Sequence, residues 1–299
     1  MVDGRPVAPG RGLDGPRHRG DGGPAGGRPA GLAAPRATEH GVTRLTCLIP
    51  AWNEAARLPG VLRAALGHPL IDRLLVIDDG STDGTPEVAR RFGAEVLNMP
   101  ANGGKTAALA AGIGALEGTH ALLLDADLSG LTPHDITRLA TPVLDGRAEV
   151  TLSLRGNAPR LWRALGVDYI SGERVLPVAL LKALAPDLPG LPRFGFEVFL
   201  NQAMRSQGLR VEIVAWPGVA SPWKTEKQGM WSGFRGDAAM IRDILRCQSP
   251  RALLEQILWL RRQTARQNRT CSATAAVVSP TTSPSQMPTP SNPARNPSP

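Results

Sequence analysis

Two pairs of aspartates follow apolar stretches of this sequence, and both pairs could do chemistry. In LLLDADLSG, Asp125 and Asp127 stand two residues apart directly after an apolar run. In LLVIDDGSTDGT, Asp78 and Asp79 end a second apolar run and precede a short, flexible loop. Two hard oxygen ligands at a strand end suit Mg²⁺ or Mn²⁺, with the phosphates of a ligand completing the shell. The simpler alternative is that one aspartate caps a turn and the other is solvated.

The elements around these carboxylates predict a sheet that brings them together. Apolar runs typical of buried strands occur at 44–54, 73–80, 94–99 and 120–127. Stretches with helical spacing lie between them, at 55–68, 84–93 and 105–116. The alternation predicts an α/β fold with a mostly parallel central sheet flanked by helices. Such sheets bind ligands at the carboxyl ends of their strands, so one rim should collect Glu54, Asp78, Asp79, Asn102, Lys105, Asp125 and Asp127.

The segment ANGGKTAAL resembles the end of a phosphate-binding loop, because Gly104, Lys105 and Thr106 match the close of a Walker A motif. Met99 occupies the position of the first motif glycine, and the preceding strand is the third rather than the first, which argues against a P-loop NTPase. Lys105 stays a candidate partner for phosphate or for a rim carboxylate, and the alternative is a solvated helix start. Gly112 predicts close helix packing.

Two further expectations concern the helices predicted at 84–93 and 105–116. Thr85 is expected to cap the helix that begins after GSTDG, with Pro86 at its first position. Gly114 is expected to allow close helix packing in the same way as Gly112.

Composition divides the chain into four parts. A Gly/Pro/Arg-rich tail (1–43) and a Ser/Thr/Pro-rich tail (270–299) are expected to be disordered, because neither can bury enough apolar surface to offset its ordering entropy. Residues 44–249 form the globular domain, and 250–269 form a basic amphipathic helix. The net charge is +8, yet residues 44–249 hold 22 Lys or Arg against 21 Asp or Glu. The domain has no basic face typical of nucleic-acid binding, so no nucleic-acid partner is expected.

Cysteine usage and hydropathy bear on location. Cys47, Cys247 and Cys271 are scattered without metal-ligand spacing, which fits a reducing compartment. No secretory signal and no run of 18 apolar residues is found in the sequence. We therefore expect a cytoplasmic protein, with contact at the inner face of the membrane as an alternative. The helix at 250–266 could lie on an anionic membrane surface or dock on the domain.

The segments LIPAWNE, VIDDGSTDGT, NGGKTAAL and LLLDAD occur in this order and spacing. Over about 44–245 the chain thus resembles family 2 of the glycosyltransferases, which have the nucleotide-diphospho-sugar transferase (GT-A) fold. The resemblance implies that Glu54 and Asp78 or Asp79 face base and ribose, and that Asp125 and Asp127 face the metal and the diphosphate. The nucleotide-sugar site expected in this way comprises Pro50, Asn53, Glu54, Asp78, Asp79, Gly80, Lys105 and Asp125.

The second half resembles the polyprenyl-phosphate branch of that family, typified by dolichyl-phosphate mannose synthase. SLRGNAPRLWRALGVDYISGERVLP matches its S-R dipeptide and D-x-x-S-G-x-R element at Ser153, Arg155, Asp168, Ser171, Gly172 and Arg174. Guanidinium groups suit phosphate geometry, so Arg155 and Arg174 are expected to contact the acceptor. Arg160 and Arg163 could join them or be ordinary surface charges. Lys224 and Lys227 are expected to contribute from a closing loop, in which Ser221, Pro222 and Trp223 replace the usual His or Arg.

The expected enzyme is an inverting glycosyltransferase that uses a nucleotide-diphospho-sugar and Mg²⁺ or Mn²⁺. An acceptor phosphate needs no base, whereas an acceptor hydroxyl needs Glu197, Asp168 or Glu173 to take its proton. The expected catalytic residues are Asp127, Glu197 and Asp168. The acceptor could be a polyprenyl phosphate, or instead a soluble hydroxyl or phosphorylated metabolite. A non-catalytic nucleotide-binding module with the same rim is the alternative from another class, and nucleotidyl transfer is disfavoured because PAWNEAARL replaces its Gly-rich basic loop.

Overall fold

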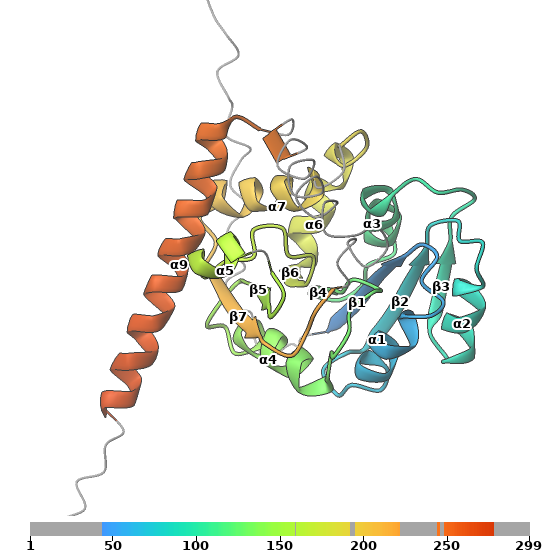
Figure 1. The fold of residues 1–299 in the computed structure, drawn as a ribbon, viewed down its shortest axis with the longest axis horizontal. Helices are drawn as coiled ribbons and strands as arrows, with labels where there is room; N and C mark the ends of the chain where they lie inside the picture. Colours follow the sequence, from blue (N-terminus) through green and yellow to red (C-terminus); the bar gives the residue numbers. More distant parts are fainter. Residues whose placement is uncertain (1–43, 159, 192–194, 222–243, 246–247, 278–299) are drawn as a thin grey trace, which may run out of the picture. The chain divides into compact units, whose positions relative to one another are not determined.

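A seven-stranded sheet forms the centre of the fold (Figure 1). Its strands are β1 (Leu45–Ala51), β2 (Arg73–Asp78), β3 (Glu95–Asn98), β4 (His120–Leu123), β5 (Val150–Arg155), β6 (Arg174–Pro177) and β7 (Val211–Trp216). Their order in the sheet is β3-β2-β1-β4-β6-β5-β7. Strands β1 to β4 are parallel, and β6 runs antiparallel to its neighbours β4 and β5. The predicted mostly parallel α/β sheet is therefore confirmed.

Helices cover both faces of this sheet. They are α1 (Leu58–Ala65), α2 (Thr85–Arg91), α3 (Lys105–Gly114), α4 (Pro133–Leu144), α5 (Arg160–Leu165), α6 (Val178–Leu184), α7 (Gly195–Ser206) and α9 (Pro250–Val277), with a 3₁₀ turn η1 at Ala185–Asp187. Successive side chains of a strand point to opposite faces, and in β1 both faces are buried. Leu48 packs in the core shared with α3, α6, α7 and α9, whereas Cys47 and Ile49 pack in the core shared with α1 and α4.

The computed structural model describes residues 44–158, 160–191, 195–221, 244–245 and 248–277, all within the unit that begins at Val42. The two predicted disordered tails, apart from 270–277, lie outside the described residues, as do Lys224 and Lys227. The first predicted helix proves shorter than 55–68, because α1 spans only Leu58–Ala65.

Parallel pairing brings the ends of three strands to one edge of the sheet. Ala51 of β1 pairs with Asp78 of β2, and Leu48 pairs with Leu123, the last residue of β4. The predicted strand at 120–127 is shorter than expected, and Asp125 and Asp127 follow it in a loop. The chain thus places its acidic loops side by side beyond β1, β2 and β4.

The two glycines of α3 have different surroundings. A Cβ at Gly112 would lie 2.9 Å from Cδ1 of Ile77, so the predicted close packing of α3 on the sheet is confirmed there. A Cβ at Gly114 would meet nothing within 4 Å, so the same prediction is wrong for Gly114. The predicted cap of α2 also needs correction, because Gly84 occupies the N-cap position with φ of 82° and Thr85 is the first helical residue.

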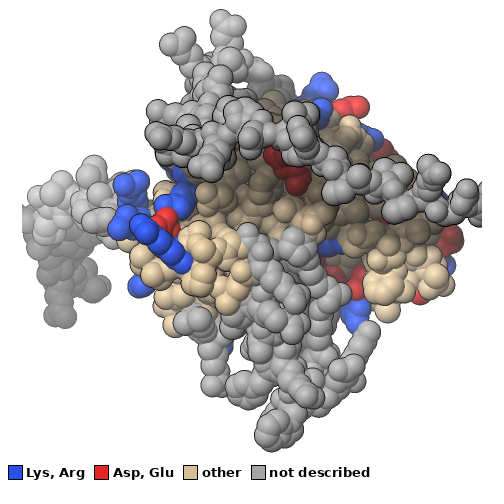
Figure 2. All heavy atoms as spheres, turned by 90° about the horizontal axis from the view of Figure 1, so that it is seen from above, with Lys and Arg blue, Asp and Glu red and all other residues tan. Residues whose placement is uncertain are grey.

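Helix α9 docks on the domain, which was one of the two alternatives for the basic helix. Leu260 and Gln256 are fully buried, and the helix packs against β7 and α7. The helix continues past residue 269 to Val277, into the stretch expected to be disordered. Seen from above, basic side chains gather on the side of the view where Figure 1 places α9 (Figure 2). Across the described ranges, no helix has the length and apolar character needed to cross a membrane.

Candidate active site

A cavity of 610 Å³ opens at the carboxyl ends of β1, β2 and β4, where the sheet edge was expected to bind a ligand. Its wall comes from the loops that follow these strands and from the start of α3, with Leu191 and Glu197 added from the second half of the chain. Glu197 belongs to α7, so the cavity joins residues that are far apart in the sequence.

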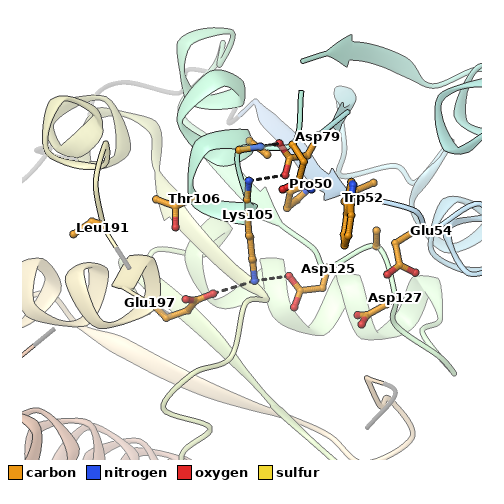
Figure 3. Close-up of a pocket in the computed structure, with 16 residues that line it drawn as sticks. Pro50, Trp52, Glu54, Asp79, Lys105, Thr106, Asp125, Asp127, Leu191 and Glu197 are labelled. Carbon is orange, nitrogen blue, oxygen red and sulfur yellow. Dashed lines mark hydrogen bonds and ion pairs between the residues drawn. The ribbon is translucent and has the colours of Figure 1, made fainter. Parts of the chain in front are cut away.

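The charged groups of the cavity are mostly acidic. Five carboxylates line the described part of its wall, against the single ammonium group of Lys105; they are those of Glu54, Asp79, Asp125, Asp127 and Glu197. Figure 3 shows Glu54, Asp125 and Asp127 along one side of the cavity, with the Trp52 ring beside them. A diphosphate would be repelled by this wall, so an anionic ligand needs a cation as its companion.

The neighbouring negative charges change the pKa of Asp127. Partial burial, the carboxylate of Asp125 and that of Glu54 together raise the pKa of Asp127 to about 6. An ordinary aspartate has a pKa near 3.8, so the ionised form of Asp127 is unfavourable here. A divalent cation between the carboxylates would remove the penalty.

The donor set fits a divalent cation that shares its ligands with a substrate. Among the described residues, no three or more His, Cys, Asp or Glu side chains are placed to hold a metal ion by themselves. Asp125 and Asp127 supply carboxylate oxygens, which Mg²⁺ and Mn²⁺ prefer, and phosphate oxygens of a nucleotide would complete the shell. Residues of this chain therefore suit a cation that binds together with a nucleotide.

Lys105 forms an ion pair with two of the five carboxylates. Its Nζ lies 2.7 Å from Oδ1 of Asp125 and 3.0 Å from Oε1 of Glu197 (Figure 3). Burial opposes the charge on the ammonium group, but Asp125 and Glu197 outweigh it and raise the pKa of Lys105. Burial also opposes the charge on Asp125, which by itself would raise the pKa of this carboxyl. The nearby ammonium group of Lys105 outweighs burial and keeps that pKa below its ordinary value. Of the alternatives left open by the sequence, the structure thus pairs Lys105 with rim carboxylates.

Gly172 lies directly against the ion pair of Lys105 and Asp125. A Cβ added there would lie 2.6 Å from Nζ of Lys105 and 2.7 and 2.8 Å from the carboxylate oxygens of Asp125. The sequence suggested that the D-x-x-S-G-x-R element contacts an acceptor. Its glycine instead leaves space for Lys105 to reach Asp125.

Asp79 binds the backbone of the segment that resembles a phosphate-binding loop. Its two carboxylate oxygens accept hydrogen bonds from the N–H groups of Gly103 at 2.8 Å and Gly104 at 2.7 Å. These groups lie at the N-terminus of α3, where a negative charge is favourable. Asp79 lines the cavity, whereas Asp78 is buried beside it and accepts a hydrogen bond from the N–H of Ser81. Within the described structure, Oδ1 of Asp78 has no hydrogen-bond partner.

Of three other residues expected to contact the nucleotide, one lines the cavity and two lie in loops outside its lining. Pro50 lines the cavity. Gly80 has φ of 69°, and a Cβ there would lie 2.7 Å from backbone atoms of Ala101 and Asn102, so this glycine lets two loops approach each other rather than a ligand. Asn53 does not line the cavity. Its amide oxygen instead accepts a hydrogen bond from the N–H of Thr82 at 2.8 Å.

Of the three candidate bases, Glu197 lies on the described wall of the cavity. Asp168 is buried and its Oδ2 accepts a hydrogen bond from Arg155 at 2.9 Å. Glu173 is also buried, and its Oε2 accepts a hydrogen bond from Ser153 at 2.6 Å. The expected catalytic role of Asp168 therefore needs correction, since its carboxylate neutralises Arg155 inside the protein.

Burial also corrects the expected acceptor site. Arg174 is fully buried, and it donates hydrogen bonds to the carbonyl of Ser171 and to Oδ1 of Asn201, both at 2.8 Å. Desolvation lowers its pKa, as expected for an enclosed guanidinium. The Arg155 side chain is 11% exposed and carries its charge toward Asp168 and Glu173. Neither arginine is among the described cavity residues: Arg155 is ion-paired inside the protein, and Arg174 is hydrogen-bonded to neutral groups there.

Trp52 is the largest of the cavity residues that the sequence-based site omitted. Its side chain is 52% exposed although it is large and apolar, and it lines the cavity. Its position between the apolar strand β1 and the polar residues Asn53 and Glu54 was the available signal. An exposed aromatic ring beside a ligand cavity is an unusual use of apolar surface and marks a binding surface.

We expect Asp127→Asn to stabilise the metal-free protein at high pH. Well below pH 3.8, the ordinary pKa of an aspartate, the carboxyl is protonated in both folded and unfolded chains, so it costs nothing. As the pH rises through 6 the folded chain must ionise a group whose pKa is raised, which lowers stability by at most about 3 kcal/mol. With EDTA present, the melting temperature of the variant should therefore exceed that of the wild type at pH 8, and by much less at pH 4.

The control for this prediction is Asp187→Asn, which changes an exposed carboxylate. It should leave the melting temperature unchanged at both pH values. Equal melting temperatures of Asp127→Asn and wild type at pH 8 would contradict the crowding of these carboxylates.

We expect Gly172→Ala to separate Lys105 from Asp125 because the new methyl group overlaps both side chains. Activity that depends on Mn²⁺ should fall on the order of a hundredfold, as displaced active-site groups commonly cost. Gly218→Ala is the matched control, since a Cβ there meets nothing within 4 Å. The measurement is metal-dependent donor hydrolysis together with the melting temperature, and an active, stable Gly172→Ala variant would refute the role.

Comparison with known proteins identifies the first half of the chain. The sequence model of the family described as Glycosyl transferase family 2 matches residues 46–164. A dolichyl-phosphate beta-glucosyltransferase of Trichomonas vaginalis is 35% identical over 97 residues, which are 28% of this chain and 30% of that protein. Glucosyl-3-phosphoglycerate synthase of Mycobacterium tuberculosis is 31% identical over 158 residues, which are 48% of this chain and 49% of that protein.

The same synthase is also similar in structure. Its crystal structure in complex with Mn²⁺, uridine diphosphate and glucosyl-3-phosphoglycerate has a TM-score of 0.57 and 25% sequence identity, and the match covers 72% of this chain and 80% of that chain. The chain spans about half the length, or less, of the two curated relatives. The predicted GT-A architecture is confirmed. The segment that matches the model of glycosyl transferase family 2, residues 46–164, carries β1 to β5 and the acidic rim.

Proposed function

We propose that this chain is a glycosyltransferase that moves a sugar from a nucleotide-diphospho-sugar to an acceptor and requires Mn²⁺ or Mg²⁺. The observation that carries the proposal is the acidic pair Asp125 and Asp127 at the rim of the cavity, within the family 2 segment. The complex of the mycobacterial synthase with Mn²⁺ and uridine diphosphate supports the same donor chemistry here.

In this proposal Asp125 and Asp127 hold the cation, and Glu54, Asp79 and Trp52 surround the nucleoside. When bound, the cation supplies positive charge that stabilises the leaving diphosphate. Lys105 keeps Asp125 ionised and in place. The cavity therefore prepares a cation site whose final ligands arrive with the donor.

The acceptor proposal follows from which base reaches the cavity. Glu197 lines it and is 5% exposed, and Lys105 fixes its carboxylate. A base at this position favours an acceptor hydroxyl, such as that of a small phosphorylated molecule, because a phosphate acceptor needs no proton removed. The mycobacterial synthase binds glucosyl-3-phosphoglycerate, in which a small phosphorylated molecule of this kind carries the sugar.

A polyprenyl phosphate is the second candidate acceptor, and the outer face of α9 favours it. Leu254 is 56% and Leu258 41% exposed, although both are apolar. Arg251, Arg261 and Arg262 are exposed at helical spacing along the same helix. A helix with exposed leucines among arginines suits an anionic membrane surface, where a lipid-linked acceptor would lie.

The test of the function is a donor screen with the purified chain. Each nucleotide-sugar is incubated with Mn²⁺ and either phosphoglycerate or a short polyprenyl phosphate, and released nucleoside diphosphate is measured. We expect Asp127→Ala to abolish turnover while the circular dichroism spectrum stays unchanged. Wild-type turnover in Asp127→Ala at saturating Mn²⁺ would refute the metal assignment. The anomeric configuration of the product tests the expected inversion.

Glu197→Gln separates the two acceptor classes. The amide oxygen still accepts the hydrogen bond from Lys105, but the side chain no longer takes a proton. Transfer to a hydroxyl should fall roughly 10²- to 10⁴-fold, the usual contribution of a general base. Transfer to a phosphate oxygen should change little, so the ratio of the two rates identifies the acceptor chemistry.

Membrane contact through α9 predicts binding that depends on charge. The chain should co-sediment with anionic vesicles at 0.1 M salt and much less at 1 M, because the Debye length falls from about 10 Å to about 3 Å. Arg261→Glu with Arg262→Glu should abolish the binding. Arg90→Glu with Arg91→Glu, on exposed positions of α2, is the matched control. Equal co-sedimentation with neutral vesicles would contradict the contact.

A further inference from the structure

Three successive backbone N–H groups after β1 are bound by side chains of the loop after β2. Asn53 donates to Oγ of Ser81 at 2.9 Å. Glu54 donates to Oγ1 of Thr85 at 2.8 Å, and Ala55 donates to Oδ2 of Asp83 at 3.1 Å. We call this set of cross-loop bonds the clip. It uses the STDGT part of the segment that follows Asp78 and Asp79.

The clip is internally braced. Thr85 donates its hydroxyl proton to Oδ1 of Asp83, which leaves the lone pairs of that hydroxyl free to accept from Glu54. Oδ1 of Asp83 also accepts the N–H of Thr85 at 3.1 Å. Asn53 returns a bond by accepting the N–H of Thr82. Asp83 and Thr85 therefore fix both their own loop and the loop opposite.

The backbone inside the clip is held in an unusual conformation. Asn53 has φ of 54°, the one positive value among the described non-glycine residues. Asparagine tolerates this left-handed region better than most residues, but surrounding contacts must maintain it. The bonds on both sides of Asn53 provide those contacts.

The conformation sends the neighbours of Asn53 into the cavity. Trp52 and Glu54 line the cavity wall, whereas Asn53 and Ala55 do not. Figure 3 shows Trp52 and Glu54 beside Asp127. A change in the backbone at residues 53–55 would move the ring and the carboxylate together.

We propose that Asp83 and Thr85 are positioning residues, which act through the clip to hold Trp52 and Glu54 against the nucleotide of the donor. The inference rests on the proposed function for the identity of the ligand. Neither residue lines the cavity, so their effect on binding is transmitted through the backbone of residues 53–55. The loop STDGT thereby orients the nucleotide site without touching it.

Asp83→Asn is the sharpest variant, because its amide has one acceptor oxygen where the carboxylate has two. Either Ala55 or Thr85 then loses its acceptor. Thr85→Val removes the acceptor for Glu54 at nearly constant volume, and Thr85→Ser should restore it. The control is Asp135→Asn in the capping box of α4, which lies outside the cavity wall. Asp135 accepts both bonds from Thr132 through Oδ2 alone, so the amide oxygen can replace it.

Two measurements are needed on each variant. Hydrogen exchange reports the amides of residues 53–55, and calorimetry reports the affinity for UDP or GDP with Mn²⁺, whichever the wild type binds. We expect Asp83→Asn and Thr85→Val to exchange faster at 53–55 and to bind the nucleotide about tenfold more weakly. Thr85→Ser and Asp135→Asn should match the wild type in both measurements.

The outcomes separate the clip from the proposed function. Wild-type exchange at 53–55 in Asp83→Asn would overturn the clip. Fast exchange with wild-type affinity would overturn the positioning role, as would an equal loss of affinity in Asp135→Asn. A wild-type chain that binds no nucleoside diphosphate with Mn²⁺ would count against the proposed function, and the exchange result would still decide the clip.

Discussion

The ion pairs of Lys105 with Asp125 and Glu197 are the interaction on which the cavity depends. They join the start of α3, the loop after β4 and helix α7, and they place the one positive charge of the described wall among five carboxylates. Without that ammonium group, Asp125 and Glu197 would repel each other in a partly buried setting. The pairs thus keep the acidic rim compact in the absence of a cation, and they fix Asp125 and Glu197, two of the three carboxylates that the proposed reaction uses.

The second half of the chain supports this interaction from behind. Gly172 leaves the space in which Lys105 meets Asp125. Arg174 and Asp168 lie in a buried network with Asn201 and Arg155, so the element resembling a phosphate-binding motif has become part of the interior. Buried charges are costly unless they are paired or hydrogen-bonded. Arg155 is paired with the carboxylate of Asp168, and Arg174 donates to the neutral oxygens of Ser171 and Asn201. In the proposed reaction, the acceptor chemistry is consequently concentrated at Glu197.

Parts of this arrangement were readable from the sequence because their cause is local. Apolar runs that end in carboxylates predicted parallel strands, and parallel strands end on the same edge, so the rim of Glu54, Asp79, Asp125 and Asp127 was predictable. Gly112 was predictable from its place inside an apolar helix. Gly114 looked equivalent, but it faces open space at the end of α3. The antiparallel strand β6 had no comparable signal, since four residues show little periodicity.

The sequence by itself determined the class of fold, the acidic rim and the family of residues 46–164, because hydrophobic period and motif spacing act over short distances along the chain. Only the tertiary structure decided which charged residues face the cavity. Lys105 and Glu197 are 92 residues apart, and no local pattern could pair them. The same holds for the bonds from Ser81, Asp83 and Thr85 to the loop after β1. Side chains of one type become ligands, supports or buried ion pairs according to how distant segments pack, and packing is a property of the whole fold.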